Sequence, residues 1–376
     1  MKTNLLKNYE IRIGEPYKTV FDTERGIYQD GTTPVFRDKD GKLWAMSGHT
    51  HVGHIAVFCG SRMSNLKELY PIRTNFSTGK AGEAFDCVRY PEGVLPRGSI
   101  WPMGLYICPV THRFFCFFHN ETGWAANGTG YVIKGKGDGE PDFRHIGLMH
   151  SDDEGKTWDF DRWVITSHAV CFSEYYNPDG VNVVGQRKGV TCLGAGDFSL
   201  FVDRKEKYLY IFYNLIDYDS EKDEWCSCNL YVARAEMLDN GLIGDFVKYY
   251  NGSFSTAGNL GKESPILENV WHARVAYMEK EGFYLLSGVK IERNKKEVAE
   301  AFTDTAVFYT SENDILSWSE PMQTVHDGKL FGNHYVAVFS DDEKLDENVI
   351  GNRPLFYLNH NATDVIAYPF ELVAVK

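Results

Sequence analysis

The sequence predicts an all-β protein, with its strands arranged as a single β-propeller. Short apolar or alternating runs end in Gly, Asp, Asn or Lys, which is typical of strands and turns, and helical periodicity is hard to find. The 24 Phe, 22 Tyr and 8 Trp also suit pleated strands better than helical bundles. A unit of two strands joined by a charged turn recurs along the 376 residues, at a spacing that leaves room for four strands. Such a repeat indicates a propeller.

Five copies of this unit can be aligned by eye. They span residues 32–51, 100–121, 197–214, 272–290 and 334–360. The clearest outer hairpins follow at 55–61, 145–160, 229–237 and 305–321. Only one strand, at 364–376, follows the fifth copy, so we expect residues 9–17 to supply the missing outer strand. Pairing of the chain ends would close five blades of four antiparallel strands in one domain, 1–376, without exposed edges. A sixth blade within 161–195 is the competing count.

Residues 151–158 read Ser-Asp-Asp-Glu-Gly-Lys-Thr-Trp and predict a tight turn. Gly155 permits a positive φ, the Asp153 carboxylate can accept hydrogen bonds from turn amides, and Trp158 can pack between blades. The segment resembles the Asp-box, or BNR repeat, of sialidase-like propellers, with weaker versions at 311–318 and from Ser64. We expect these turns to support the fold and to lie away from the active face.

The composition argues against several partners and cofactors. A formal net charge of −13, from 39 basic and 52 acidic residues, would repel phosphate backbones, so nucleic acid is disfavoured. No apolar run is long enough to span a membrane, and the N-terminal residues resemble a first strand more than a signal peptide. We therefore expect a cytoplasmic protein, or a secreted one if a leader has been trimmed. The eight Cys lack zinc-type spacing and are expected to be buried thiols.

Propeller connectivity nominates the residues of a central pocket. The innermost strand of each blade runs along the channel and the second returns, so the start of one and the end of the other share a face. First-strand starts are Asp30, Trp101, Asp197, His272 and His334. Second-strand ends are His49, His51, His119, Glu121, Asn214, Asp217, Lys290, Glu292, Arg293 and His360. The predicted pocket is therefore rich in carboxylates, imidazoles and aromatic rings.

Several of these residues have a structural alternative. Asp30, in Gln-Asp-Gly, can cap a turn, and Asp197 follows Gly-Ala-Gly, whose small residues allow close backbone approach near the axis. His49, His51 and His54 have a metal-like spacing, but strand alternation places His54 on the opposite side. We therefore expect these histidines to contact substrate or solvent, with no metal ligand among them.

Around the candidate carboxylates the chain resembles the five-bladed propeller glycoside hydrolases of the arabinanase, β-xylosidase and fructosidase type. Asp30-Gly-Thr-Thr-Pro-Val stands where that family has Asp-Pro before its first strand. Asp197-Phe-Ser-Leu-Phe resembles its Asp-Pro-Ser-Leu-Phe, and Glu263-Ser-Pro resembles its Glu-Gly-Pro. Asp30 lacks the following Pro, Glu263 is followed by Ser, and the interval 31–196 is long for the family. Glu121 is a rival for the role of the glutamate.

This resemblance implies hydrolysis of an oligo- or polysaccharide by paired carboxyl groups. Asp30 would be the base, Glu263 or Glu121 the acid, and Asp197 would orient the acid and raise its pKa by like-charge proximity. Expected substrate contacts are His51, Trp101, His119, Asn214, His272, Arg293, His334 and His360. Trp101, Trp124 and Trp271 are candidates for stacking on a sugar, with blade packing as the alternative. No cofactor is expected, although a structural calcium or another cation near the axis is left open.

Two other functions compete with hydrolysis. A second resemblance, to Asp-box propellers that include ulvan-type polysaccharide lyases, implies His, Tyr and Arg chemistry on a uronate. Its candidates here are His51, His119, Tyr213 and Arg293. A carbohydrate-binding propeller without converging carboxylates is the non-enzyme alternative. Sialidase activity is disfavoured because the sequence has no Arg-Ile-Pro signature and no legible arginine triad. Sugar specificity and oligomeric state are left open.

Overall fold

The dominant secondary structure in the part of the chain that the structure describes is the β-strand, as the sequence predicts. The computed structural model describes residues 2–23, 29–49, 54–73, 88–89, 99–121, 144–168, 189–219, 221–222, 224–295, 298–360 and 363–375. Within these ranges α-helix is confined to the four-residue α2 (Val298–Ala301). None of the helices in the same ranges has the length and apolarity that crossing a membrane requires.

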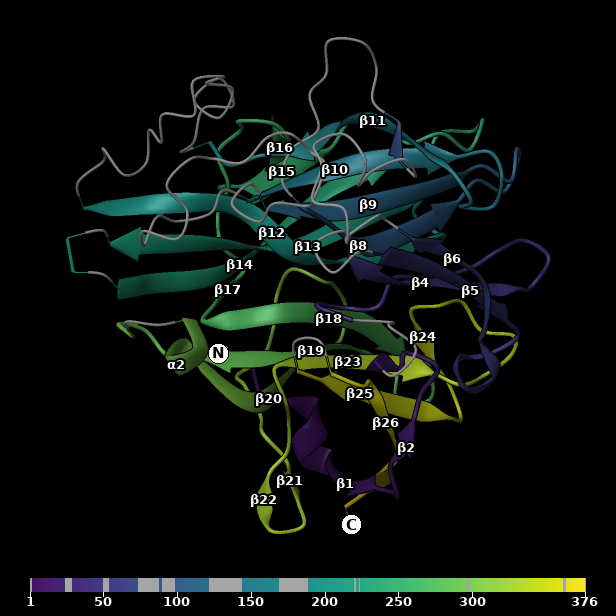
Figure 1. Ribbon diagram of the computed structural model, residues 1–376. Helices are drawn as coiled ribbons and strands as arrows, with labels where there is room; N and C mark the ends of the chain where they lie inside the picture. Colours follow the sequence, from purple (N-terminus) through teal and green to yellow (C-terminus); the bar gives the residue numbers. More distant parts are fainter. Residues whose placement is uncertain are drawn as a thin grey trace.

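In the described residues the strands pair antiparallel in five successive groups (Figure 1). The first comprises β3 (Val35–Arg37), β4 (Leu43–His49), β5 (His54–Gly60) and β6 (Lys67–Arg73). The second comprises β8 (Ser99–Ile107), β9 (Phe114–Glu121), β10 (Arg144–Ser151) and β11 (Trp158–Ile165). The third comprises β12 (Val190–Asp203), β13 (Tyr208–Asp219), β14 (Glu224–Glu236), β15 (Val247–Tyr250) and β16 (Ser253–Ala257). The fourth comprises β18 (Val270–Met278), β19 (Phe283–Ile291) and β20 (Phe302–Ser311).

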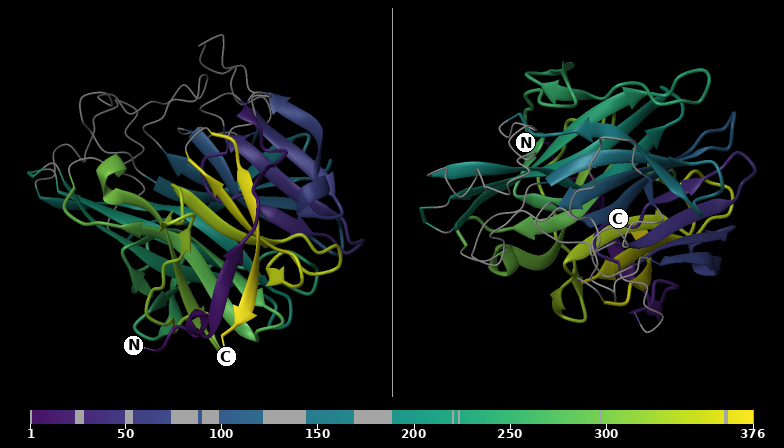
Figure 2. Two further views of the ribbon diagram at one scale, coloured as in Figure 1. Left: turned by 90° about the horizontal axis from the view of Figure 1, so that it is seen from below. Right: turned by 45° about the horizontal axis from the view of Figure 1, so that its top comes forward.

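The fifth group contains strands from both ends of the chain. It comprises β23 (Tyr335–Ser340), β25 (Pro354–Asn359), β26 (Ile366–Ala374) and β1 (Tyr9–Ile13). β1 pairs antiparallel with β26 from Tyr9–Ala374 to Ile13–Phe370, and Figure 2 shows the purple N-terminal strand beside the yellow C-terminal one. The predicted pairing of the two chain ends is therefore confirmed.

Shorter elements connect or flank these groups. They are η1 (Leu5–Asn8), η3 (Met63–Asn65), β2 (Tyr17–Lys18), β7 (Val88–Arg89), β17 (Leu267–Glu268), β21 (Val325–His326), β22 (Lys329–Leu330) and β24 (Val349–Ile350). A single parallel pairing, between Arg144 of β10 and Gly194 of β12, joins the second group to the third. Most of the competing sixth blade, residues 169–188, lies outside the described residues.

Each predicted two-strand unit coincides with the first two strands of one group. The pairs are β3 and β4, β8 and β9, β12 and β13, β18 and β19, and β23 and β25. Apolar clusters span neighbouring groups: one contains Val232 and Leu286, a second contains Val289 and Val336, and a third contains Ala45 and Ala337. A larger cluster joins the first three groups. The fifth group therefore shares a core with the first as well as with the fourth.

The predicted turn at 151–158 forms between β10 and β11. Asp153 Oδ1 accepts hydrogen bonds from Ser151 Oγ at 2.7 Å and from the Thr157 amide at 2.9 Å. The Gly155 amide donates to Ser151 Oγ at 2.8 Å, Gly155 has a φ of 84°, and the Trp158 side chain is fully buried. The expected turn chemistry is confirmed.

The two weaker versions of this turn differ from each other. Asp314 Oδ1 accepts hydrogen bonds from the amides of Leu316 and Ser317, so the segment 311–318 also forms an Asp-centred turn. Ser64 instead lies in η3, and its amide and hydroxyl both donate to the Asp341 carboxylate.

Candidate functional site

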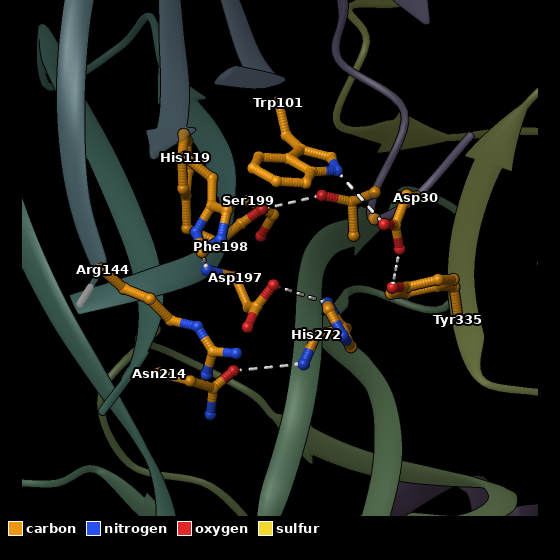
Figure 3. A network of polar contacts seen from close by, with 12 residues as sticks. Asp30, Trp101, His119, Arg144, Asp197, Phe198, Ser199, Asn214, His272 and Tyr335 are labelled. Atoms are coloured by element: carbon orange, nitrogen blue, oxygen red, sulfur yellow. Dashed lines mark hydrogen bonds and ion pairs between the residues drawn. The ribbon is translucent and has the colours of Figure 1, made fainter. Parts of the chain in front are cut away.

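Residues from all five strand groups meet in one network. Most lie near the start of a first strand or the end of a second, but Asp197 and Asn214, predicted at such positions, lie within β12 and β13 because both strands extend further than predicted. A continuous chain of contacts joins His49, Trp101, Asp30, Tyr335, His272, Asp197, His119, Glu121 and Arg144, with Asn214, His334 and His360 attached. Figure 3 shows the part of this network that contains Asp30, Trp101, Tyr335, His272, Asp197 and His119. The connectivity argument made from the sequence is thus supported by direct contacts across the groups.

Asp30 accepts hydrogen bonds from two aromatic side chains. The Tyr335 hydroxyl donates to Oδ1, and Trp101 Nε1 donates to Oδ2 at 3.2 Å. The Trp101 ring stacks on the imidazole of His49, with centroids 5.1 Å apart and planes at 18°. Burial raises the pKa of the Asp30 carboxyl, Glu121 raises it further by repulsion, and the Tyr335 and Trp101 hydrogen bonds oppose the rise.

Asp197 occupies an irregular position in β12. The pairing of β12 with β13 shifts register between Gly196 and Ser199, and Asp197 has a φ of 46°. A bulge of this kind re-aims a side chain, and Asp tolerates the left-handed region better than bulkier residues do. His272 lies at the corresponding irregularity of β18, between Trp271 and Arg274, with a φ of 51°. His272 Nδ1 is 3.9 Å from Asp197 Oδ1.

His119 connects Asp197 to Glu121. The Asp197 amide donates to His119 Nδ1 at 2.9 Å, so this nitrogen carries no proton and the proton of the neutral ring lies on Nε2. Nε2 is 3.2 Å from Glu121 Oε1. Burial raises the pKa of Asp197, and Glu121 and Asp30 raise it further, whereas His119 and Arg144 oppose the rise.

Small residues make this arrangement sterically feasible. A side chain at Gly196 would overlap the His119 imidazole, and one at Gly194 would overlap the Arg144 carbonyl. The sequence reasoning that the Gly-Ala-Gly before Asp197 permits close approach is therefore confirmed.

Glu121 ends β9 directly opposite Arg144, the first residue of β10. Arg144 Nε donates to Glu121 Oε1 at 2.8 Å, and His119 approaches the same oxygen. Since Glu121 acts on the pKa of both Asp30 and Asp197, its carboxylate is within electrostatic reach of both aspartates.

Glu263, the other predicted acid, lies in a different environment. Its carboxylate pairs with the fully buried Lys248 ammonium, and its Oε1 is 2.7 Å from His168 Nδ1. Lys248 also donates to the carbonyls of Thr166 at 2.7 Å and Gly261 at 2.9 Å. Burial lowers the pKa of Lys248, and the Glu263 charge opposes this. Within the described ranges, no contact joins Glu263 to Asp30 or Asp197.

His272 is held as a neutral group among aromatic rings. Burial lowers its pKa well below the ordinary value, and His334, His119 and Arg144 add to this effect. Its ring lies 4.2 Å from the Tyr335 ring, and its amide donates to Asn214 Oδ1 at 3.2 Å. The Asn214 side chain therefore contacts the backbone of His272, which suits a positioning role.

Most other nominated residues lie apart from the network. Arg293 is exposed and donates to Asn269 and Glu268, and Asp217 accepts from Ser227. Lys290 and Glu292 face each other on the surface. Tyr213 is a core residue. Trp271 is also buried, but it touches the network, because its ring centroid lies 5.2 Å from that of His272 and the Arg144 guanidinium lies 5.9 Å from the ring. His51 and Trp124 lie outside the described residues, so their predicted roles are untested.

Sequence reasoning missed Tyr335 and Arg144. Tyr335 begins β23 directly after His334, so both residues lie in the network. Arg144 begins the third strand of its group, beside the end of the second. The same connectivity argument, extended to third strands, would have nominated it.

One group of side chains in the described residues could hold a metal ion. Asp304, His334 and His360 each offer a ligand atom, and these atoms lie within 4.8 Å of one another.

Comparisons with known proteins give distant structural similarities. No protein-family model and no curated protein matches the sequence. The catalytic domain of a Coprinopsis cinerea GH62 α-L-arabinofuranosidase is similar over 96% of this chain and 97% of its own, at 10% identity and a TM-score of 0.45. A GH43 β-1,3-galactosidase is similar over 97% and 95%, at 14% identity and 0.47. An endo-arabinase from Bacteroides thetaiotaomicron is similar over 96% and 98%, at 13% identity and 0.42. Likenesses this distant do not assign an activity to the chain.

Proposed function

We propose that this protein is a glycoside hydrolase that cleaves an oligo- or polysaccharide by paired-carboxylate catalysis. The observation that carries the proposal is the convergence of Asp30, Asp197 and Glu121 in one network lined by imidazole and aromatic rings. Two carboxyl groups in different protonation states are what glycoside hydrolysis requires. Aromatic rings beside them provide surfaces for sugar stacking.

Asp30 is best suited to the role of base. Hydrogen bonds from Tyr335 and Trp101 stabilise its ionised form, and their fixed geometry orients the carboxylate. Burial holds its pKa above that of a solvated aspartate, which increases its basicity.

We assign the acid role to Glu121 and leave Glu263 as the alternative. Glu121 lies within electrostatic reach of both aspartates. Arg144 fixes its carboxyl by donating a hydrogen bond to Oε1. Glu263 is instead paired with the buried Lys248 ammonium and makes no contact with the two aspartates in the described residues.

A polysaccharide lyase is the second candidate because His119, His272, Arg144 and Tyr335 share the network. Two observations favour hydrolysis over it. The three carboxyl groups would repel a uronate. Burial and those same carboxylates also raise the pKa of Tyr335, which disfavours a tyrosinate base.

The five strand groups and their shared apolar clusters support our further inference that 1–376 forms one five-bladed propeller domain. In this arrangement the turn at 151–158 is an Asp-box on an outer hairpin, away from the carboxylates.

A glycan screen for released reducing ends, run alongside ultraviolet detection of unsaturated uronates, separates the two functions. Hydrolysis without unsaturated product is expected. Asp30→Asn should reduce turnover by about 100-fold or more, and full turnover in this variant would remove the base assignment.

The acid is identified with aryl glycosides of the sugar found in that screen. Glu121→Gln should lose activity on the natural glycan but keep it on an aryl glycoside whose phenol leaves without protonation. The matched variant Glu263→Gln should not show this selective recovery. The reverse pattern would transfer the acid role to Glu263.

A further inference from the structure

Two histidines and an aspartate from three separate segments meet beside the carboxylate network. Asp304 belongs to β20, His334 immediately precedes β23, and His360 immediately follows β25. Their ligand atoms lie within 4.8 Å of one another, and Asp304 Oδ1 is 3.5 Å from His334 Nδ1. The rings of His334 and His360 have centroids 4.8 Å apart. The three donor groups are therefore already gathered at one point.

The spacing of these donor atoms fits a small divalent ion. With tetrahedral metal–ligand bonds of about 2.0–2.1 Å, neighbouring ligand atoms lie about 3.3 Å apart. The 3.5 Å between Asp304 Oδ1 and His334 Nδ1 is close to this value, and the other separations, which reach no more than 4.8 Å, would close to it by a small movement of the exposed His360 side chain. Two imidazoles and one carboxylate suit zinc and its first-row neighbours, whereas calcium prefers a shell of oxygen ligands.

We propose that Asp304, His334 and His360 bind a divalent transition-metal ion, with zinc the best match to the donor set. His334 is buried, whereas Asp304 and His360 are exposed. This combination gives the ion a path from solvent and leaves a coordination position for water or a substrate oxygen.

The segments that carry the ligands are held in place without a metal. The Ala306 amide donates to the Phe331 carbonyl at 2.9 Å, which joins β20 to the segment that leads to His334. A side chain at Gly332 would clash with the Asp304 carbonyl, so this close packing requires glycine. The His360 amide donates to Thr363 Oγ1 at 2.9 Å. Because its segments are already ordered, such a site loses less conformational entropy when it binds its ion.

A metal at this position would connect the fourth strand group to the fifth beside Asp30. His334 precedes Tyr335, and the Tyr335 hydroxyl donates to Asp30. Metal binding would therefore restrict the segment that orients the proposed base. The binding itself does not depend on the proposed activity.

Metal titration of the full-length, untagged chain tests the proposal. After treatment with a chelator and dialysis, the protein is titrated with zinc chloride and, separately, calcium chloride by isothermal calorimetry. One zinc per chain is expected, with calcium at least about 100-fold weaker, the difference that ligand type produces. Cobalt(II) should give visible absorption bands of a protein-bound ion. Absence of zinc binding, or equal affinity for calcium, would overturn the proposal.

Ligand variants locate the bound ion. Asp304→Asn and His360→Gln change exposed side chains and should each weaken zinc binding at least about 10-fold. The matched control is His326→Gln, because His326 faces Asp327 at 3.7 Å and offers the same two donor types without a second imidazole. The control should bind zinc like the wild type. If zinc binding weakens equally in the control, or is unchanged in both ligand variants, the ion binds elsewhere and the assignment is wrong.

Thermal stability provides a second readout. Zinc should raise the Tm of the wild type and of the control by mass action, and should leave the Tm of Asp304→Asn unchanged. A similar rise in all three proteins would contradict the site.

Discussion

Asp197 is a buried carboxyl whose ionisation opposes folding. Because its pKa is raised in the folded state, the folded protein holds this proton more tightly than the unfolded chain does. The resulting contribution to stability is fully present below the ordinary aspartate pKa of 3.8 and is lost as the pH rises through the raised value. Ionisation of Asp197 in the folded protein therefore carries a cost in stability, as expected of a functional group.

Asp197→Asn should stabilise the protein at neutral pH and abolish hydrolysis. Asn tolerates the φ of 46° and removes the carboxyl whose ionisation burial disfavours, so we expect a gain in stability. The gain should disappear below pH 3.8. Thermal unfolding followed across pH measures it.

The control for this experiment is Asp203→Asn, at the other end of β12. Asp203 accepts hydrogen bonds from the amides of Lys205 and Glu206, a role that Asn can fill. No stabilisation is expected in the control. A gain for Asp197→Asn that does not change with pH would contradict the electrostatic explanation.

At the residue scale, connectivity could identify most of the network but could not assign the charge partners. It placed Asp30, Asp197 and Glu121 on one face because strand ends follow from the repeat. It could not anticipate that Lys248, in β15, pairs with Glu263. This contact depends on how β15 and β16 are placed at the edge of the third group. Arg144 was missed for a similar reason, since its partner lies across a long connection.

At the scale of elements, the tight turn between β10 and β11 organises a hairpin through one carboxylate. Asp153 accepts from the Ser151 hydroxyl and from both the amide and the hydroxyl of Thr157. The turn lies at the opposite end of β10 from Arg144, so its contribution should be to stability alone.

Asp153→Ala should destabilise the protein without changing the activity of the folded fraction. Loss of these hydrogen bonds is expected to cost about 1–3 kcal/mol. The control is Asp161→Ala. Asp161 is an exposed residue of β11 that pairs with Arg162, so its loss should change stability by less than about 0.5 kcal/mol. Denaturant midpoints give both values, and a specific loss of turnover in Asp153→Ala would show that the turn reaches the pocket.

The strands were predictable because alternation and the charged turns repeat five times. The irregularities within them were not. The register shifts around Asp197 and His272 break the two-residue period that identifies a strand, and the side chains at these points take left-handed backbone conformations. The bulges therefore position the two residues in ways that sequence alternation cannot reveal.

At the scale of the whole molecule, the N-terminal segment connects two strand groups. β1 completes the fifth group, while the fully buried Asn4 donates from Nδ2 to the carbonyls of Phe308 at 2.8 Å and Glu320 at 2.9 Å, next to the fourth group. The chain end is thereby held to both groups.

Asn4→Ala should weaken the protein as a whole. Loss of the hydrogen bonds made by this buried side chain is expected to cost about 1–3 kcal/mol, and the unfolding transition should shift without splitting. Asn8→Ala, at an exposed position in η1, is the matched control and should have little effect. A separate early transition in Asn4→Ala would indicate that the fifth group unfolds by itself.

The contact network depends on the absence of a side chain at Gly196. The hydrogen in place of a side chain lets the imidazole of His119 lie against β12, where it meets the Asp197 amide and Glu121 together. A single added methyl group would separate an aspartate from a glutamate without altering either carboxyl. Crowding at Gly196 alone would thus disrupt the network while leaving every carboxylate in the sequence.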